Sequence, residues 1–114
     1  MCTTHMVSTI EEIEFLARSE HRMSVLGVLA EGSCNRHELC EATGASSPTI
    51  GRILSDFKNR QWTVRDGPAY ELTPLGEFVA DRFADLRRAM EMERELRDVW
   101  EYIPSEMNGF TFEM

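Results

Sequence analysis

Two short segments with helical apolar spacing meet at Gly44, and this junction constrains the fold more than any other part of the chain. The first segment opens with the cap-like run Asn35-Arg36-His37-Glu38 and stops at Gly44, a residue that commonly terminates helices. The second opens with Ser47-Pro48, and proline is tolerated in the first turn of a helix. Its expected inward face has the spacing i, i+3, i+4, i+7 and consists of Ile50, Ile53, Leu54 and Phe57.

Helix signals also precede this pair. Ser8 and Glu11 stand three residues apart in a capping-box pattern, which predicts a helix that begins near Ser8. Ser19 is placed to cap a second helix, and Gly32 is placed to end it. The chain up to residue 60 is therefore expected to be a succession of short helices.

The apolar period then changes. Residues 62–65 and 69–72 are short, β-prone and roughly alternating, and Asp66-Gly67-Pro68 between them predicts a two-stranded hairpin. Thr73-Pro74 opens the longest helical pattern, which Pro104 limits. Two short helices followed by a hairpin are the sequence pattern of a helix-turn-helix with a wing. The predicted fold is α+β and mostly helical, with a winged helix-turn-helix domain over residues 1–73, a long helix over 74–104 and a tail over 105–114.

In a helix-turn-helix the second helix reads DNA, so the polar residues opposite its inward face are candidates for that role. Arginine recognises guanine, asparagine recognises adenine, and serine or threonine reaches a base or a phosphate. Gly51 lets a DNA backbone or a neighbouring helix approach closely. The expected major-groove residues are Thr49, Arg52, Ser55 and Asn59; the expected phosphate or minor-groove contacts are Ser47 at the helix N-terminus, Lys58, Arg60 and, on the wing, Arg65.

The overall charge argues against a nucleic-acid partner at first sight. The formal net charge is −8, with 20 acidic residues against 12 basic ones, of which only Lys58 is lysine. An acidic, lysine-poor surface suits a protein that works at high salt, where self-repulsion is screened. Local charge decides the matter: residues 47–65 contain four basic residues against Asp56, a local excess of three positive charges.

Two runs of residues resemble those of a known family. The run Gly44-Ala45-Ser46-Ser47-Pro48-Thr49-Ile50-Gly51-Arg52-Ile53-Leu54 and the run Tyr70-Glu71-Leu72-Thr73-Pro74-Leu75-Gly76-Glu77 resemble the recognition helix and the wing exit of winged-helix regulators of the ArsR/MarR type, in particular a haloarchaeal group. The resemblance covers about residues 9–110. It implies a transcriptional regulator without catalysis. Many such relatives continue into a C-terminal effector or sensor domain, so residues 105–114 are expected either to begin such a domain or to end a minimal regulator.

A possible metal or redox sensor is formed by Cys34, His37 and Cys40, which have the spacing C-x₂-H-x₂-C. A fourth ligand would have to come from Cys2, His5 or a second subunit. The simpler interpretation is that Cys40 packs in the core and the other two residues lie on the surface. We favour that interpretation and expect no cofactor, and three cysteines do not suggest a disulfide framework.

The long helix is expected to mediate dimerisation. About 30 residues of helix span roughly 45 Å, which exceeds the width of so small a domain. Its distal apolar residues then need a partner, either a second copy or an absent C-terminal domain. We favour a homodimer through Leu86, Met90, Leu96 and Trp100.

The expected function is sequence-specific binding of double-stranded DNA by a cytoplasmic transcriptional regulator, with an unidentified effector as a further possible partner. No signal peptide, membrane-spanning run, Walker loop, glycine-rich dinucleotide turn or H-E-x-x-H motif is present in the sequence, so no enzymatic activity and no membrane partner are expected. The alternatives are a winged-helix protein-interaction scaffold, which the acidity would suit, and a metal- or thiol-sensing repressor.

Overall fold

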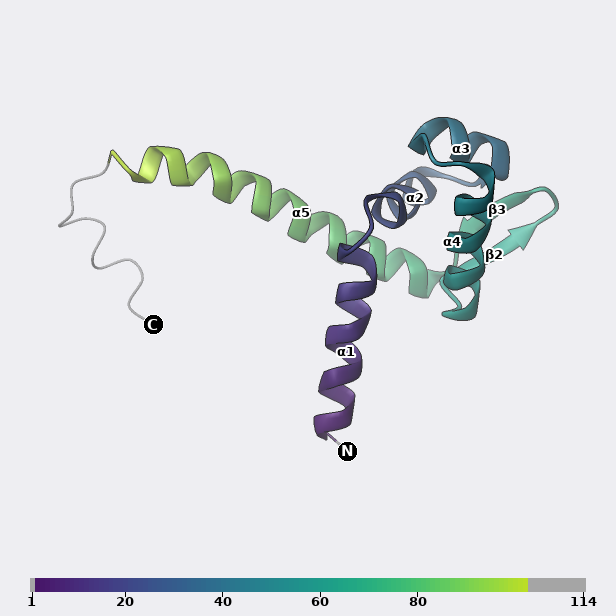
Figure 1. Cartoon of the computed structure of the whole chain (residues 1–114), viewed down its shortest axis with the longest axis horizontal. Helices are drawn as coiled ribbons and strands as arrows, with labels where there is room; N and C mark the ends of the chain where they lie inside the picture. Colours follow the sequence, from purple (N-terminus) through teal and green to yellow (C-terminus); the bar gives the residue numbers. More distant parts are fainter. Residues whose placement is uncertain (1, 103–114) are drawn as a thin grey trace. The chain divides into compact units, whose positions relative to one another are not determined.

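The computed structural model describes the backbone of residues 2–102 and the side chains of residues 9–102 (Figure 1). In chain order the elements are α1 (Cys2–Ala17), α2 (Glu20–Glu31), β1 (Cys34–Asn35), α3 (Arg36–Thr43), α4 (Ser47–Asn59), β2 (Thr63–Asp66), β3 (Ala69–Leu72) and α5 (Pro74–Trp100). Contacts divide the chain into one compact unit that ends at Asp81 and a second that begins at Arg82, so the boundary lies within α5. The fold is the predicted one, mostly helical α+β with a wing and a long C-terminal helix. No helix in the described part is long and apolar enough to cross a membrane.

The first two helices follow the sequence signals in part. Helix α1 begins at Cys2, so the prediction of a start near Ser8 is wrong. A capping-box pattern needs a non-helical residue at its first position, and here the helix continues through it. The prediction for α2 is confirmed, because the Ser19 side chain accepts a hydrogen bond from the Arg22 backbone N–H at 3.2 Å and Gly32 ends the helix.

The turn between α3 and α4 forms as its residues predict, with a shift of one position. Asn35 and Glu38 make a complete capping box at the start of α3, and Gly44 ends that helix in the left-handed conformation with φ 77°. Helix α4 is capped by Ser46 rather than Ser47, since the Ser46 hydroxyl accepts from the backbone N–H of Thr49 at 3.3 Å. Pro48 still lies in the first turn, where its missing N–H leaves no intrahelical bond unmade.

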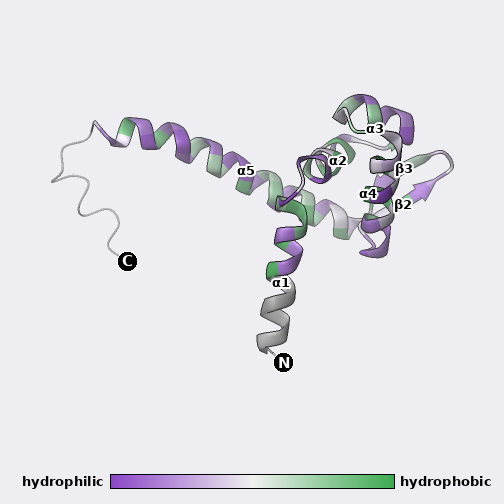
Figure 2. Cartoon of the chain, in the orientation of Figure 1, coloured by the Kyte–Doolittle hydropathy of each residue, from purple (hydrophilic) through white to green (hydrophobic). Residues whose placement is uncertain are grey.

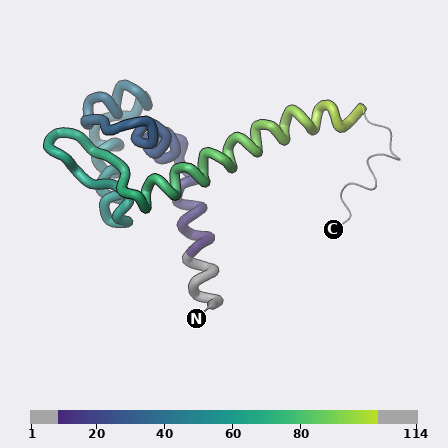
Figure 3. Tube along the Cα trace, turned by 180° about the vertical axis from the view of Figure 1, so that it is seen from behind, coloured from purple at the N-terminus to yellow at the C-terminus, as the bar shows by residue number. Residues whose placement is uncertain are grey.

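The wing belongs to a sheet of three strands rather than the expected two. Strands β2 and β3 pair antiparallel across the tight reversal of the chain that Figure 3 shows, and Gly67 adopts φ 62° there. Strand β1 pairs with the other edge of β3, with Cys34 opposite Tyr70 and Asn35 opposite Ala69. A strand of two residues has no alternating pattern for the sequence to reveal, so its pairing depends on the tertiary fold.

The core of the first unit is formed by apolar side chains of the helices, together with Trp62 and Leu72. In Figure 2 the helices alternate between hydrophobic and hydrophilic stretches, as amphipathic helices do. Phe15, Phe57 and Trp62 form an aromatic cluster with ring centroids 5.5–6.3 Å apart. The largest fully buried side chains are Phe57, Leu26, Leu39, Ile50 and Val25.

Thr73 joins the wing to α5. Its hydroxyl accepts from the Gly76 backbone N–H at 3.0 Å and donates to the Gln61 carbonyl at 2.7 Å, while its own N–H donates to the Trp62 carbonyl at 2.8 Å. Gly76 is buried directly against that Trp62 carbonyl. The helix ends at Trp100, short of the expected residue 104, and Pro104 lies outside the described residues.

Candidate nucleic-acid interface

Helix α4 carries an exposed polar face. Arg52, Ser55, Lys58 and Asn59 are exposed, and the four large apolar residues of the helix are buried on the other side. Ser47 is also exposed. Thr49 is half-buried, and its hydroxyl accepts from Ser46 at 3.0 Å within the cap.

A groove of about 760 Å³ lies between α4 and the wing. Three of its lining residues are cations, Arg36, Lys58 and Arg65, and none is a carboxylate. Ser55 and Tyr70 add polar groups to its wall. Of the residues predicted from the sequence, Ser55, Lys58 and Arg65 are thus brought together, whereas Arg52, Asn59, Thr49 and Ser47 lie outside the groove.

Arg36 is the residue of this groove that the sequence analysis missed. It is the first residue of α3, and its side chain crosses to the start of α4. There Nε donates to the Ser47 hydroxyl at 3.1 Å, and Nη2 donates to the Ser47 carbonyl at 2.9 Å. A Cβ at Gly51 would overlap the Arg36 guanidinium. The signal in the sequence was therefore Gly51: the close approach expected there is made by an arginine of the preceding helix.

Arg65 is held in place on the wing. Its Nε donates to the Gly67 carbonyl at 3.0 Å, and its guanidinium carbon lies 5.4 Å from the centroid of the Tyr70 ring. These contacts restrict the side chain while leaving it exposed. A cation that is ordered in advance loses less conformational entropy when an anion binds.

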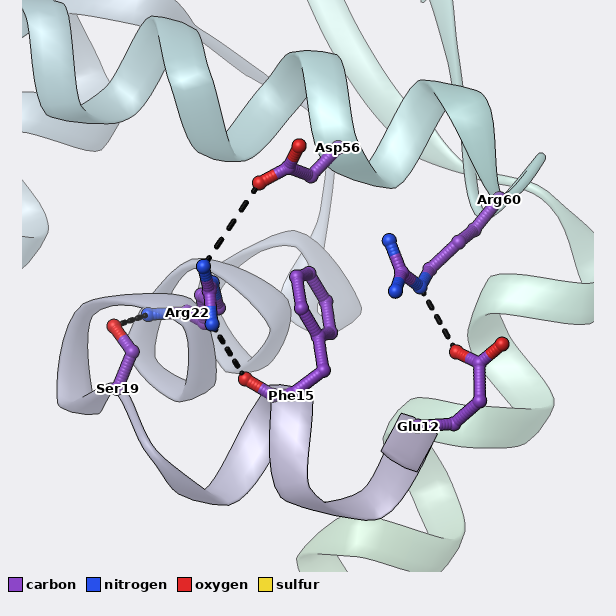
Figure 4. A network of polar contacts seen from close by, with 6 residues as sticks. All are labelled: Glu12, Phe15, Ser19, Arg22, Asp56 and Arg60. Atoms are coloured by element: carbon purple, nitrogen blue, oxygen red, sulfur yellow. Dashed lines mark hydrogen bonds and ion pairs between the residues drawn. The ribbon is translucent and has the colours of Figure 1, made fainter. Parts of the chain in front are cut away.

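Arg60 lies in a different environment from the other predicted cations. Figure 4 shows the ring of Phe15 between Arg22 and Arg60, whose guanidinium carbons are 4.1 and 3.7 Å from its centroid. Arg60 Nε donates to Glu12 at 2.9 Å, and Arg22 lies 4.0 Å from Asp56. The network joins α1, α2 and α4.

These ion pairs change the local charge derived from the sequence. Asp56, the acidic residue that lowered the local positive charge of residues 47–65, faces Arg22. The charge of Arg60 is compensated by Glu12. Within the described residues, Arg36, Arg52, Lys58 and Arg65 have no carboxylate at ion-pair distance. Four cations on α3, α4 and the wing are therefore without an ion pair in the described part of the chain, although Asp66 and Glu71 also lie on the wing strands.

The residues of the C-x₂-H-x₂-C pattern show no metal-site geometry. Cys34 lies in β1 with Sγ 3.8 Å from the Gly32 carbonyl, and His37 lies 3.5 Å from Glu41. Burial raises the pKa of the Cys34 thiol, and the carboxylates of Glu38 and Glu31 raise it further. No group of three potential ligands comes together among the described residues, which exclude the side chains of residues 1–8.

The residues predicted to mediate dimerisation lie on the distal part of α5. Leu86, Met90 and Leu96 are 51%, 55% and 60% exposed, and Trp100 is half-buried. Charged side chains between them pair along the helix, as Arg97 does with Glu93.

Several solved structures share this fold, and one of them is a transcription regulator. B. subtilis YodB, solved with bound quinone, shares 17% identity and a TM-score of 0.66, over 75% of this chain and 98% of that one. The MarR-family protein Rv2887 of Mycobacterium tuberculosis shares 17% identity and a TM-score of 0.64, over 83% and 78%. MepR of Staphylococcus aureus, a transcription regulator of the multidrug efflux pump MepA, shares 18% identity and a TM-score of 0.62, over 93% and 85%.

At these identities the likeness establishes the winged helix-turn-helix fold alone. No curated protein sequence matches the chain. Residues 10–95 match the HVO_A0261 N-terminal domain. The match includes the whole of the helix-turn-helix and the wing, and α5 as far as residue 95. The chain therefore belongs to the family of the HVO_A0261 N-terminal domain.

Proposed function

We propose that this protein binds double-stranded DNA in a sequence-specific manner and acts as a transcriptional regulator. The observation that carries the proposal is the groove between α4 and the wing, which is lined by three cations and no carboxylate in a chain of net charge −8. A concave surface lined by cations of one sign favours an anionic ligand. Phosphate is the anion that a recognition helix and a wing meet together.

The exposed face of α4 supplies the sequence-reading groups. In the proposal Arg52, Ser55 and Asn59 contact base edges in the major groove, with Thr49 at the start of the same face. Lys58 and Arg65 contact phosphates on either side of the groove, and Ser47 lies near a phosphate at the N-terminus of α4. Arg60 takes part only after it leaves Glu12, because its charge is already compensated.

Two proteins of similar structure support a regulatory role. MepR is a transcription regulator, and the DNA binding of BpsR of Bordetella bronchiseptica is regulated by 6-hydroxynicotinic acid. By analogy, the proposal includes an effector of unspecified chemistry. It assigns no catalysis, and it places the protein in the cytoplasm, where the chromosome is accessible.

The proposal further includes a homodimer formed through α5. Winged-helix regulators commonly read paired half-sites as dimers. The distal part of α5 exposes large apolar side chains that a second copy would cover.

A titration of the full chain with duplex DNA tests the proposed function. Fluorescence anisotropy against a randomised duplex library, followed by selection of the bound fraction, should yield an enriched sequence. The affinity for it should fall as salt concentration rises. A protein-interaction scaffold would show no affinity for any duplex at any salt concentration at which the fold is intact, and that result would contradict the proposal.

A further inference from the structure

The side chain of Arg36 lies against α4, the expected recognition helix, although Arg36 itself belongs to α3. Its Nε and Nη2 both donate to Ser47, one to the hydroxyl and one to the carbonyl, at 3.1 and 2.9 Å. An exposed arginine side chain ordinarily samples many rotamers, and fixing it costs about 2 kcal/mol of conformational entropy. Two hydrogen bonds to one neighbouring residue offset that cost here and hold the guanidinium in a single place.

Gly51 provides the space for this arrangement. Glycine in the interior of a helix costs about 1 kcal/mol relative to alanine, and Gly51 is the fifth of the 13 residues of α4. The atoms that a Cβ at this position would meet are Nη2, Cζ and Nη1 of Arg36. The glycine therefore has a specific role, which is to let the guanidinium lie against the helix backbone.

The charge of Arg36 has no carboxylate partner among the residues that the structure describes. Both of its hydrogen-bond acceptors are neutral oxygens, and in the described part of the chain no carboxylate lies at ion-pair distance from it. The guanidinium carries five N–H donors in a planar fork, so donors remain beyond the two used on Ser47. Arg36 also lines the groove, together with Lys58 and Arg65. The groove thus contains an ordered and uncompensated cation.

We propose that Arg36 is a phosphate-binding residue of the DNA interface, fixed by Ser47 and Gly51 so that it sets the position of the DNA backbone against α4. This inference rests on the proposed function and adds to it a residue outside the recognition helix and the wing. A backbone phosphate suits Arg36 better than a base edge, because the guanidinium is tied to the start of α4 rather than free to follow a base. Phosphate contacts of this kind fix register and carry no sequence information directly.

Two variants of the full chain test the assignment by separate routes. Arg36→Ala removes the cation. Gly51→Ala retains the cation but displaces the guanidinium from its position against the backbone of α4. The displaced group is the end of a flexible side chain, so the fold can accommodate the added methyl group. Gly27→Ala is the matched control, since Gly27 also lies within a helix and a Cβ there meets nothing within 4 Å. Arg36→Lys keeps the positive charge but lacks the planar set of guanidinium donors.

The readout is the slope of log affinity against log salt concentration for the selected duplex. Arg36→Ala should weaken binding roughly tenfold and reduce the slope by about one unit. Gly51→Ala should shift both quantities in the same direction, Arg36→Lys should retain the slope, and Gly27→Ala should match the wild type.

Three results would overturn the assignment. If Arg36→Ala lowers the melting temperature but leaves the slope unchanged, Arg36 only ties α3 to α4. If it changes the preferred sequence, Arg36 contacts a base rather than a phosphate. If the wild-type chain binds no duplex, the proposed function fails, and this assignment fails with it.

Discussion

Arg60 Nε donates to Oε1 of Glu12 at 2.9 Å, which ties the end of the recognition helix to a residue 48 positions earlier in the chain. The Arg60 guanidinium also lies over the ring of Phe15, 3.7 Å from its centroid, and its side chain is 30% exposed (Figure 4). Helix α1 therefore already pairs the Arg60 cation within the protein. In the proposed complex, a DNA phosphate would compete with Glu12 for this guanidinium.

Glu12→Gln is expected to strengthen DNA binding. The substitution removes the carboxylate that compensates Arg60, and partly exposed ion pairs of this kind contribute about 0.2–1 kcal/mol. The affinity should therefore rise by about 1.4-fold to fivefold, with a small loss of thermal stability. Glu14→Gln is the control, because it makes the same charge change on α1 where Glu14 faces Arg18. Equal effects of the two variants in anisotropy titrations would mean that net charge alone matters.

Arg52 and Arg65 are expected to differ in how they contribute to DNA binding. Arg52 lies on the exposed polar face of α4 that is proposed to contact base edges. Arg52→Ala should therefore cost about 1–3 kcal/mol of specific binding and relax the preference at one base position. Arg65 lies on the wing, so Arg65→Ala should weaken binding to all sequences alike and reduce the salt slope by about one unit.

A competition assay on a randomised duplex library at matched salt compares these two arginine variants. Both remove one positive charge, so the contrast between them is independent of net charge. If Arg52→Ala lowers the affinity without altering the selected sequence, Arg52 contacts phosphate and the assignment of the reading face is wrong.

Alanine substitutions at two of the helical glycines, Gly76 and Gly27, are expected to change stability in opposite directions. A Cβ at Gly76 would overlap the backbone carbonyl of Trp62, which cannot move without disturbing the junction between the wing and α5. Gly76→Ala should therefore destabilise the fold by about 1–3 kcal/mol. Gly27 is exposed within α2 and a Cβ there meets nothing within 4 Å, so Gly27→Ala should stabilise it by about 0.4–1 kcal/mol. Urea unfolding measures the free energy of unfolding of both variants. A Gly76→Ala protein as stable as the wild type would contradict the close packing of Gly76 against the Trp62 carbonyl.

Sequence reasoning succeeded where structure is set by neighbouring residues. The caps at Ser19 and Asn35, the left-handed turn at Gly44 and the hairpin turn at Gly67 all involve partners within a few positions. The apolar spacing of α4 likewise predicted its buried face, because helical geometry converts sequence spacing directly into direction.

Apart from the start of α1 and the cap of α4, the features that sequence reasoning missed depend on residues that are distant along the chain. Strand β1 exists only through its pairing with β3. Arg36 reaches a partner 11 positions away, and Arg60 one 48 positions away. A charge count along the sequence treated Arg60 as available and omitted Arg36, whereas only the tertiary fold decides which cations already have a carboxylate.

The last prediction concerns the proposed dimer. Met90 lies on the same side of α5 as Leu86, and both are more than half exposed. A glutamate placed there would be buried without a partner in a dimer formed through this side, so Met90→Glu should yield a monomer. Arg88→Gln is the matched control, because it lowers the net charge by one, as Met90→Glu does, at an exposed position about 200° around the helix from Leu86.

Light scattering at several protein concentrations, at salt where the fold is intact, distinguishes the possible outcomes. The wild type and Arg88→Gln should show the mass of a dimer, and Met90→Glu should show that of a single chain with an unchanged helical signal. Dissociation by Arg88→Gln alone would place the interface on the opposite side of α5. A monomeric wild type at every concentration would remove the homodimer from the proposal, and DNA would then be read by one winged helix at a time.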